Sequence, residues 1–271
     1  MVGVKIARAC KYIFLTIAAF IAVFPLYWMV VSATNENVAV IRGSLLPGTH
    51  LIQNFQNLVD TAPLAQAFMN SVTYTIGVTI VSVIICSLAG YGFEIFHSKA
   101  KDRFMALLLV SVMVPFAAVM IPLVQLVSGL GLRNTAIGFM LPMLSSAFLI
   151  MLFRQSARSF PNEMIEAARI DGLSELSIFI RMFVPTMKAT FAAGIIIQFL
   201  VSWNAFLWPR LIMTPGGGSI NMPMLLNNLV AGYLVDNGMN MLAVLITSVP
   251  AIIIFFLLQR QFAEGISGTI K

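Results

Sequence analysis

The sequence predicts an all-α polytopic membrane protein with six transmembrane helices. Of its 271 residues, 59% are hydrophobic and 10% are charged, whereas an ordinary soluble domain has about a quarter charged residues. The mean hydropathy is +0.95. Six apolar stretches reach the length of about 20 residues that a helical span needs. Their apolar runs are continuous rather than alternating, which argues against a membrane β-barrel.

The predicted spans cover residues 12–32, 70–93, 104–127, 135–153, 189–209 and 239–259. The first could instead be a signal peptide, but its apolar core exceeds the roughly 7–15 residues of such signals. We therefore interpret it as a span, followed by an outer loop with a short surface helix at 51–59. Five spans contain proline. Helix packing accounts for any single proline, whereas prolines in most spans favour a gated pathway.

The net charge of +6 indicates orientation rather than nucleic-acid binding. In this topology Arg42, Arg133 and Arg210 lie on the outer side, and the rest of the 16 basic residues lie on the other side. Basic residues concentrate in cytoplasmic loops. Both termini are therefore predicted to be cytoplasmic, and we expect contact with membrane lipid and none with nucleic acid.

Neither catalytic nor metal-binding sets are recognisable in the sequence. Cys10 is predicted to be cytoplasmic and Cys86 lies in a span, so the two form neither a disulfide nor a metal site. His50 and His97 fall on opposite sides of the membrane. The sequence also lacks a GxxxxGK[ST] phosphate loop. We expect a transport subunit that is not an enzyme and binds no cofactor, with its energy supplied by another chain.

An ion-coupled carrier is the rival class. The spans are almost free of charged residues, which argues against proton coupling, because proton relays place ionisable groups within the membrane. A sodium-coupled carrier that uses backbone carbonyls stays open.

The stretch 161–185, PNEMIEAARIDGLSELSIFIRMFVP, is too polar to span a bilayer. Ser159 or Asn162 is expected to cap a helix whose first turn holds Pro161 and Glu163. Asp171 and Gly172 then break this helix, since glycine allows the positive φ of a reversal. Ser174 is expected to cap a second helix that runs to Phe183 and ends at Val184 and Pro185.

The first of these helices carries Glu163, Glu166 and Arg169 on one face. Ala167 and Ala168 are small, which would let another surface approach closely. Two interpretations follow from the pattern: a docking element for a separate protein, or an amphipathic loop resting on lipid headgroups.

This stretch resembles the EAA loop of binding-protein-dependent ABC importer permeases. Glu166-Ala167-Ala168 matches the signature triplet, Gly172 the glycine four residues beyond it, and Pro185 the closing proline. Met182 and Val184 replace the usual isoleucine and leucine. The resemblance extends over residues 70–271, and it implies the ABC permease fold. It also implies that the loop is a coupling helix on an ATPase subunit.

What the resemblance implies for single residues is more specific. Glu166 would pair with a basic residue of the ATPase, Gly172 would form the turn, and Ala167, Ala168 and Asp171 would belong to the same coupling site. ATP and Mg²⁺ would bind to a dimer of ATPase subunits. The implied segments are 1–69 (arm, first span and outer loop) and 70–271 (permease core, with coupling loop 161–185 and cytoplasmic tail 260–271).

Three further features are similar to the carbohydrate branch of these permeases. They are the segment 203–209 (WNAFLWP), the loop form 168–172 (ARIDG), and the tail 259–262 (QRQF) with Gly265 and 268–271. This similarity implies a sugar or oligosaccharide delivered by an external binding protein that approaches the loop 212–238. It implies a second, different permease subunit and a bacterial inner membrane. A permease for another solute is the alternative.

Four residues are candidates for the substrate pathway: Trp203, Asn204, Gln198 and Asn70. Sugars are bound by aromatic faces and by amide or hydroxyl hydrogen bonds, and these side chains offer such groups within or beside predicted spans. The alternative for each is hydrogen bonding between helices.

Overall fold

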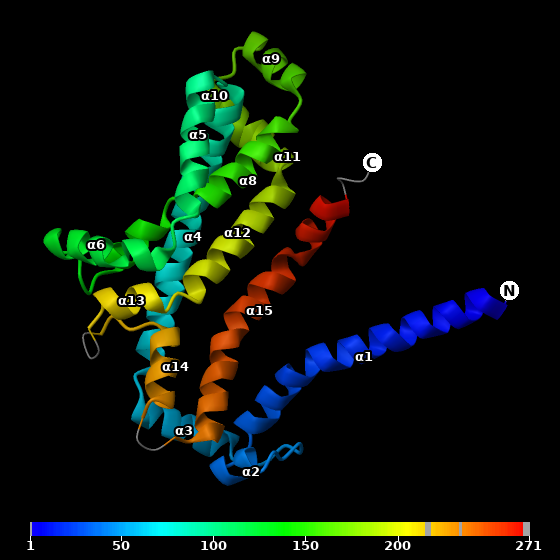
Figure 1. Cartoon of the computed structure of the whole chain (residues 1–271), viewed down its shortest axis with the longest axis vertical. Coiled ribbons are helices and arrows are strands. Elements are labelled where there is room, and N and C mark those ends of the chain that lie inside the picture. The colour runs from blue at the N-terminus through cyan, green and yellow to red at the C-terminus, as the bar shows by residue number, and fades with distance from the viewer. Residues whose placement is uncertain (1, 215–217, 233–234, 268–271) are drawn as a thin grey trace. The chain divides into compact units, whose positions relative to one another are not determined.

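A computed structural model describes residues 2–214, 218–232 and 235–267. Within these ranges all regular elements are helical, as predicted, and no strand is present (Figure 1). The helices are, in chain order, α1 (Val2–Ala33), α2 (Asn37–Ile41), α3 (Leu51–Thr61), α4 (Leu64–Ile95), α5 (Lys99–Val112), α6 (Phe116–Gly129), α7 (Ala136–Met140), the 3₁₀ helix η1 (Leu141–Met143), α8 (Ala147–Arg158), α9 (Asn162–Ile170), α10 (Glu175–Ile178), the π-helix η2 (Phe179–Phe183), α11 (Val184–Thr186), α12 (Lys188–Trp203), α13 (Leu207–Ile212), α14 (Met222–Val230) and α15 (Asn237–Ser267).

Three helices, α1, α4 and α15, are each long and apolar enough to cross a membrane. They correspond to the predicted first, second and sixth spans. Three bent pairs of helices raise the number to as many as six. α15 continues past residue 260, where the tail was predicted to begin, to Ser267. The rest of the predicted tail, 268–271, lies outside the described residues, as does the glycine turn expected at 215–217.

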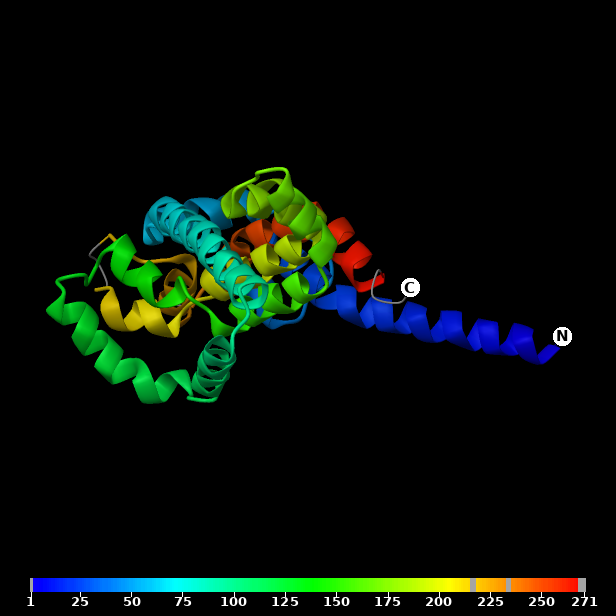
Figure 2. The same ribbon diagram turned by 90° about the horizontal axis from the view of Figure 1, so that it is seen from above.

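The predicted third span is not one helix. α5 and α6 meet at an angle of 100°, and Figure 2 shows α6 extending sideways from α5. The break falls at Pro115, which precedes α6, because proline restricts the residue before it to extended backbone and lacks an N–H. Pro122 lies inside α6 without ending it, so only one of the two predicted breaks occurs.

The predicted fifth span was too long. It was expected to run to Pro209, but α12 ends at Trp203 and α13 is a separate helix. The Leu200 carbonyl accepts from both the Asn204 N–H, at 3.1 Å, and the Asn204 side-chain amide, at 2.9 Å, so Asn204 closes the last turn of α12. Pro209 lies in the first turn of α13, where its missing N–H is tolerated.

The described parts of residues 1–65 and 225–249 form one compact unit, and those of residues 66–224 and 250–271 form a second. The division into 1–69 and 70–271 stays a prediction, since it follows sequence resemblance rather than packing. In the first unit Asn54 fixes the loop after α1, since its amide donates to the carbonyls of Ala33 and Asn35 at 2.9 Å each. The predicted surface helix at 51–59 is confirmed by α3.

In the second unit α8 packs against α5 and α12. Leu149 and Phe153 of α8 are fully buried, and Phe153 packs against Phe191 of α12 with 4.8 Å between ring centroids. α4 approaches α8 closely at Gly90, where an added Cβ would lie 2.7 Å from the Phe153 Cβ and 2.7 Å from the Arg154 nitrogen. Small residues allow membrane helices to pack at such short range.

Candidate functional site

The predicted helix–turn–helix is present as α9, a tight turn and α10. Its start differs from the prediction: Ser159 belongs to the end of α8, Asn162 is the first residue of α9, and Pro161 precedes α9 without a side-chain cap. Proline still suits this position, because the first N–H groups of a helix lack intrahelical partners in any case.

Gly172 makes the turn, with φ +79°. The Leu173 N–H donates to the Ala168 carbonyl at 3.0 Å, and the Gly172 N–H donates to the Arg169 carbonyl at 3.1 Å. These two bonds form a Schellman motif, which satisfies the last carbonyls of a helix and requires a left-handed residue. The prediction that Gly172 supplies this conformation is confirmed.

An ion pair between side chains of α9 and α10 spans the turn. The Arg169 Nε atom lies 2.6 Å from a carboxylate oxygen of Glu175, the first residue of α10. The Glu175 carboxylate holds the pKa of the Arg169 guanidinium above its usual value. Ser174 caps α10 by accepting from the Ser177 N–H at 3.4 Å, as predicted. Arg169 is therefore engaged within the loop.

The second helix does not end at Pro185. The π-helix η2 and α11 carry it on to Thr186. Proline cannot donate to the carbonyl four residues earlier, and a π-turn before it accommodates this missing bond without ending the helix.

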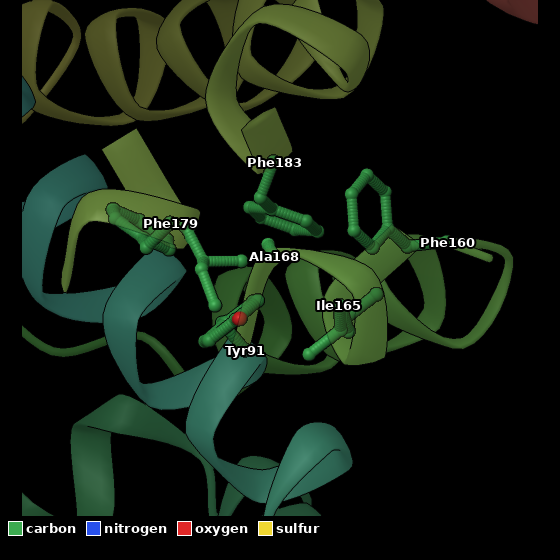
Figure 3. Close-up of a cluster of buried hydrophobic side chains, with 8 residues drawn as sticks. Tyr91, Phe160, Ile165, Ala168, Phe179 and Phe183 are labelled. Carbon is green, nitrogen blue, oxygen red and sulfur yellow. The ribbon is translucent and has the colours of Figure 1, made fainter. Parts of the chain in front are cut away.

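The inner face of α9 packs into an apolar cluster (Figure 3). Ile165 and Ala168 are 2% and 5% exposed and contact a group of aromatic side chains that includes Tyr91, Phe160 and Phe183. The ring centroids of Tyr91 and Phe183 lie 5.0 Å apart. Ala168 is thus small because the chain's own aromatic rings pack around it. This corrects the interpretation that it leaves room for another protein.

The outer face of α9, which we call the coupling surface, consists of Glu163, Glu166, Ala167, Ile170 and Asp171, all exposed. Ile170 is 86% exposed, so a large apolar side chain on this face is left uncovered by the rest of its own chain. Among the residues that the structure describes, the Glu166 carboxylate has no hydrogen-bond partner and no ion pair. A carboxylate beside an exposed isoleucine offers a partner protein both charge and apolar area.

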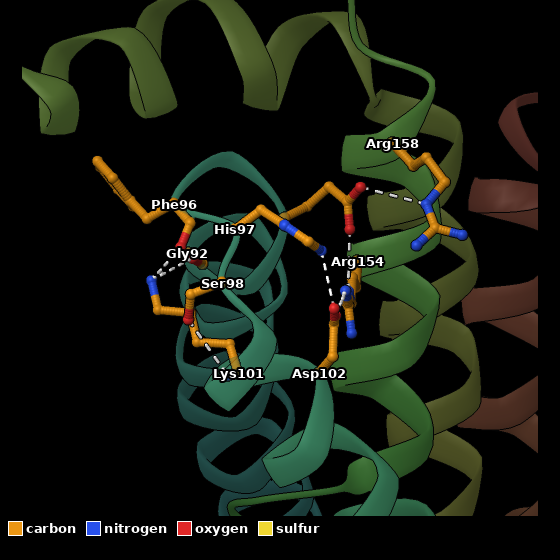
Figure 4. Close-up of polar contacts among 9 residues, drawn as sticks. Gly92, Phe96, His97, Ser98, Lys101, Asp102, Arg154 and Arg158 are labelled. Atoms are coloured by element: carbon orange, nitrogen blue, oxygen red, sulfur yellow. Dashed lines mark hydrogen bonds and ion pairs between the residues drawn. The ribbon is translucent and has the colours of Figure 1, made fainter.

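A cluster of charged side chains, which the sequence analysis missed, links α4, α5 and α8 (Figure 4). Arg154 of α8 lies with its Nε 2.9 Å from a carboxylate oxygen of Glu94 and also pairs with Asp102. Arg158 lies 3.2 Å from the other Glu94 oxygen, and His97 lies 2.9 Å from Asp102. Arg154 is 9% exposed. We call these five residues the arginine cluster.

The predicted pathway residues are not brought together. Trp203 is 2% exposed and stacks on Phe199 at 5.7 Å between ring centroids. Asn204 is exposed at the end of α12. The Asn70 amide donates to the carbonyls of Gly218 and Ile220 at 2.8 and 2.9 Å, so it holds the segment before α14 against α4.

Of these four residues, Gln198 lines a cavity. This cavity of about 550 Å³ lies among α6, η1, α8, α12 and α13, and aromatic side chains of Phe116, Phe148, Phe206 and Trp208 form much of its wall. Gln198 is 3% exposed and donates to the Met143 carbonyl at 3.1 Å. No described residue that lines the cavity is charged, and no cluster of His, Cys, Asp and Glu in the described ranges suits a metal ion.

Comparisons with known proteins cover both the coupling surface and the cavity. The family described as "Binding-protein-dependent transport system inner membrane component" matches residues 84–268, a range that includes the coupling surface and the cavity. A crystal structure of a bacterial ABC transporter involved in the import of the acidic polysaccharide alginate contains a chain with the same fold. Its TM-score is 0.84 at 20% identity, over 95% of this chain and 97% of that chain.

Several curated proteins are similar over almost their whole length. The lactose transport system permease protein LacG of Rhizobium radiobacter is 40% identical over 96% of this chain and 95% of its own. The arabinooligosaccharides transport system permease protein AraQ of Halalkalibacterium halodurans is 34% identical over 93% and 92%. The sn-glycerol-3-phosphate transport system permease protein UgpE of Escherichia coli K12 is 29% identical over the same shares.

Proposed function

The chain belongs to the family of binding-protein-dependent transport system inner membrane components, and from this we propose how its surfaces take part in import. It is a multi-pass membrane subunit, a permease of an ABC importer, and such permeases act with an ATPase and a substrate-binding protein. It forms half of a transmembrane pathway, with both termini in the cytoplasm. The second half is a different permease subunit.

The coupling surface docks on the ATPase. The observation that carries this proposal is the division of α9 into a fixed face and a free face: Ile165 and Ala168 are buried in the chain's own cluster, while Glu166 and Ile170 are exposed. ATP and Mg²⁺ bind to the ATPase dimer rather than to this chain. Glu166 pairs with a basic residue of the ATPase, and Ile170 fills an apolar depression beside it.

Movement of α9 reaches the spans through the cluster beneath it. Tyr91 belongs to α4, and Phe183 packs against Phe191 of α12 with 6.2 Å between ring centroids. Closely packed interiors transmit displacement rather than absorb it. Closure of the ATPase dimer therefore moves α9 together with the ends of α4 and α12, and the spans respond as rigid groups.

The solute is a sugar or oligosaccharide. The names of two relatives, for lactose and for arabinooligosaccharides, support this class, and the uncharged lining of the cavity is compatible with it. An external sugar-binding protein delivers the solute at the segment before α15. A permease for another solute is the second candidate, because one relative is named for sn-glycerol-3-phosphate.

Charge reversal at Glu166 tests the docking step. The importer is reconstituted with its ATPase, second permease subunit and binding protein, and co-purification of the ATPase and ATP-dependent uptake of lactose are measured. Glu166→Lys should lower both by more than about tenfold, since repulsion replaces attraction at the contact. The protein should remain in the membrane.

The matched control is Asp60→Lys, which reverses an exposed carboxylate in α3, in the loop predicted to lie outside. This variant should bind the ATPase as the unchanged protein does. Normal uptake and normal co-purification in Glu166→Lys would refute the docking role.

A further inference from the structure

The fourth predicted span is interrupted near its centre. η1 ends at Met143 and α8 begins at Ala147, and the helices before and after this point are bent by 49°. We call residues 144–146 the mid-span break. Non-helical backbone at membrane depth persists where protein buries it or where it lines a water-filled cavity. The mid-span break must therefore have its polar groups covered by one of these two means.

Two neighbouring side chains cover part of the break. Cys86 of α4 is fully buried; its thiol accepts from the Ser146 N–H at 3.5 Å and lies 3.9 and 3.7 Å from the carbonyls of Leu144 and Ser146. Gln198 of α12 covers the Met143 carbonyl. Side chains from α4 and α12 thus stabilise the non-helical conformation of the break.

Ser145, at the middle of the break, is left uncovered. It is exposed and lines the cavity. Its hydroxyl, N–H and C=O have no hydrogen-bond partner among the described residues. Groups of this kind cannot face lipid tails, so in the membrane they must be covered by water, by a polar ligand in the cavity in front of Ser145, or by the second permease subunit.

We propose that the mid-span break and Gln198 form a binding site for a neutral sugar in transit through the membrane. The aromatic walls, Phe148, Phe206 and Trp208 among them, present apolar faces to the C–H surface of a sugar ring. Ser145 presents donors and acceptors to its hydroxyl groups. Interrupted membrane helices near the bilayer centre are a common way to build such sites. The volume lies within the range of small-ligand pockets, about 300–1,000 Å³.

The lining also selects against one class of solute. A phosphorylated solute needs a cationic partner, because burying an uncompensated charge is costly, and no described lining residue is charged. The site therefore favours a neutral disaccharide or oligosaccharide over glycerol 3-phosphate. This inference rests on the proposed function, since it names the solute class for the same pathway.

Thiol labelling provides the first test. In the complete importer carrying Cys10→Ser, the Ser145→Cys variant is treated with a membrane-impermeant thiosulfonate reagent. The parent that retains only Cys86 shows the background. We expect Ser145→Cys to be labelled, and lactose with the binding protein to slow labelling several-fold, whereas glycerol 3-phosphate should not. No labelling above background, or labelling that only glycerol 3-phosphate slows, would overturn the site.

Transport kinetics provide the second test. Ser145→Ala should raise the concentration of lactose needed for half-maximal uptake about two- to tenfold, the effect of one lost hydrogen bond. Ser111→Ala is the matched control, because the Ser111 hydroxyl bonds only to the Leu108 carbonyl of its own helix. Unchanged half-saturation in Ser145→Ala, with lactose uptake intact, would refute the site while leaving the proposed function standing. Uptake of glycerol 3-phosphate without any sugar would refute both.

Discussion

The coupling surface and the mid-span break differ in which groups they leave free. At the turn after α9 the main chain bonds to itself through the carbonyls of Ala168 and Arg169, and only side chains point outward. At the break the main chain itself is uncovered at Ser145, while Cys86 and Gln198 satisfy the groups beside it. A closed backbone with free side chains suits a protein partner, and an open backbone suits a small polar solute.

One helix connects these regions. α8 begins directly after the mid-span break and ends just before α9. Near this second end Arg154 ties α8 to α4 and α5 through Glu94 and Asp102. A displacement of the coupling surface can therefore reach the break by a rigid route if the arginine cluster is intact.

Arg154→Ala should have the largest effect on stability. It leaves the Glu94 carboxylate, whose side chain is 17% exposed, without its main partner. Removing one member of a buried ion pair leaves an uncompensated charge, and we expect a loss of about 3 kcal/mol in the free energy of unfolding. Thermal unfolding in detergent measures it, as a fall in Tm. ATP-dependent uptake should fall more than ATPase binding does, because the coupling surface is unchanged.

Arg158→Ala is the control for this variant. Its side chain is 58% exposed and contacts the same carboxylate, and exposed pairs contribute little. The Tm should change by less than that of Arg154→Ala. Equal effects for the two arginines would show that α8 is not fixed through Arg154.

The sequence predicted the coupling region well because its signals are local. Gly172 needs a positive φ whatever surrounds it, and Glu163, Glu166 and Arg169 follow helical spacing. What the sequence could not give is the difference between Ala167 and Ala168. These neighbours are chemically identical, and only the position of the aromatic cluster makes one exposed and the other buried.

The spans were predicted less well, because hydropathy does not report where a helix bends. Pro115 marks a 100° break, whereas Pro122 and Pro250 lie inside continuous helices. The arginine cluster joins Arg154 to Asp102 across 52 residues, and no local pattern predicts such a pair. Trp203 has the residue type of a sugar contact, but packing buries it.

The two alanines allow the faces of α9 to be tested by one substitution each. Ala168→Leu adds three carbon atoms to a filled aromatic cluster, and overpacking of this kind costs about 1–3 kcal/mol. We expect a loss near 2 kcal/mol, seen as a lower Tm. Ala167→Leu places the same atoms on the coupling surface, so Tm should stay unchanged while ATPase co-purification falls. A stable Ala168→Leu protein, or normal ATPase binding by Ala167→Leu, would contradict the division of α9 into two faces.

Substitution of Cys86 should give the smallest effect and concerns the mid-span break alone. Cys86→Val keeps the size of the buried side chain but leaves the Ser146 N–H without its acceptor, and an unsatisfied buried donor costs about 1–3 kcal/mol. The thiol contact is long, 3.5 Å, and thiols are weak acceptors, so we expect about 1 kcal/mol. Cys86→Ser restores an acceptor and should lose less. Thermal unfolding measures both variants, and labelling of Ser145→Cys in each background reports whether the break has changed shape. If Cys86→Val left stability and labelling unchanged, α4 would not hold the break open, and its shape would depend on Gln198 alone.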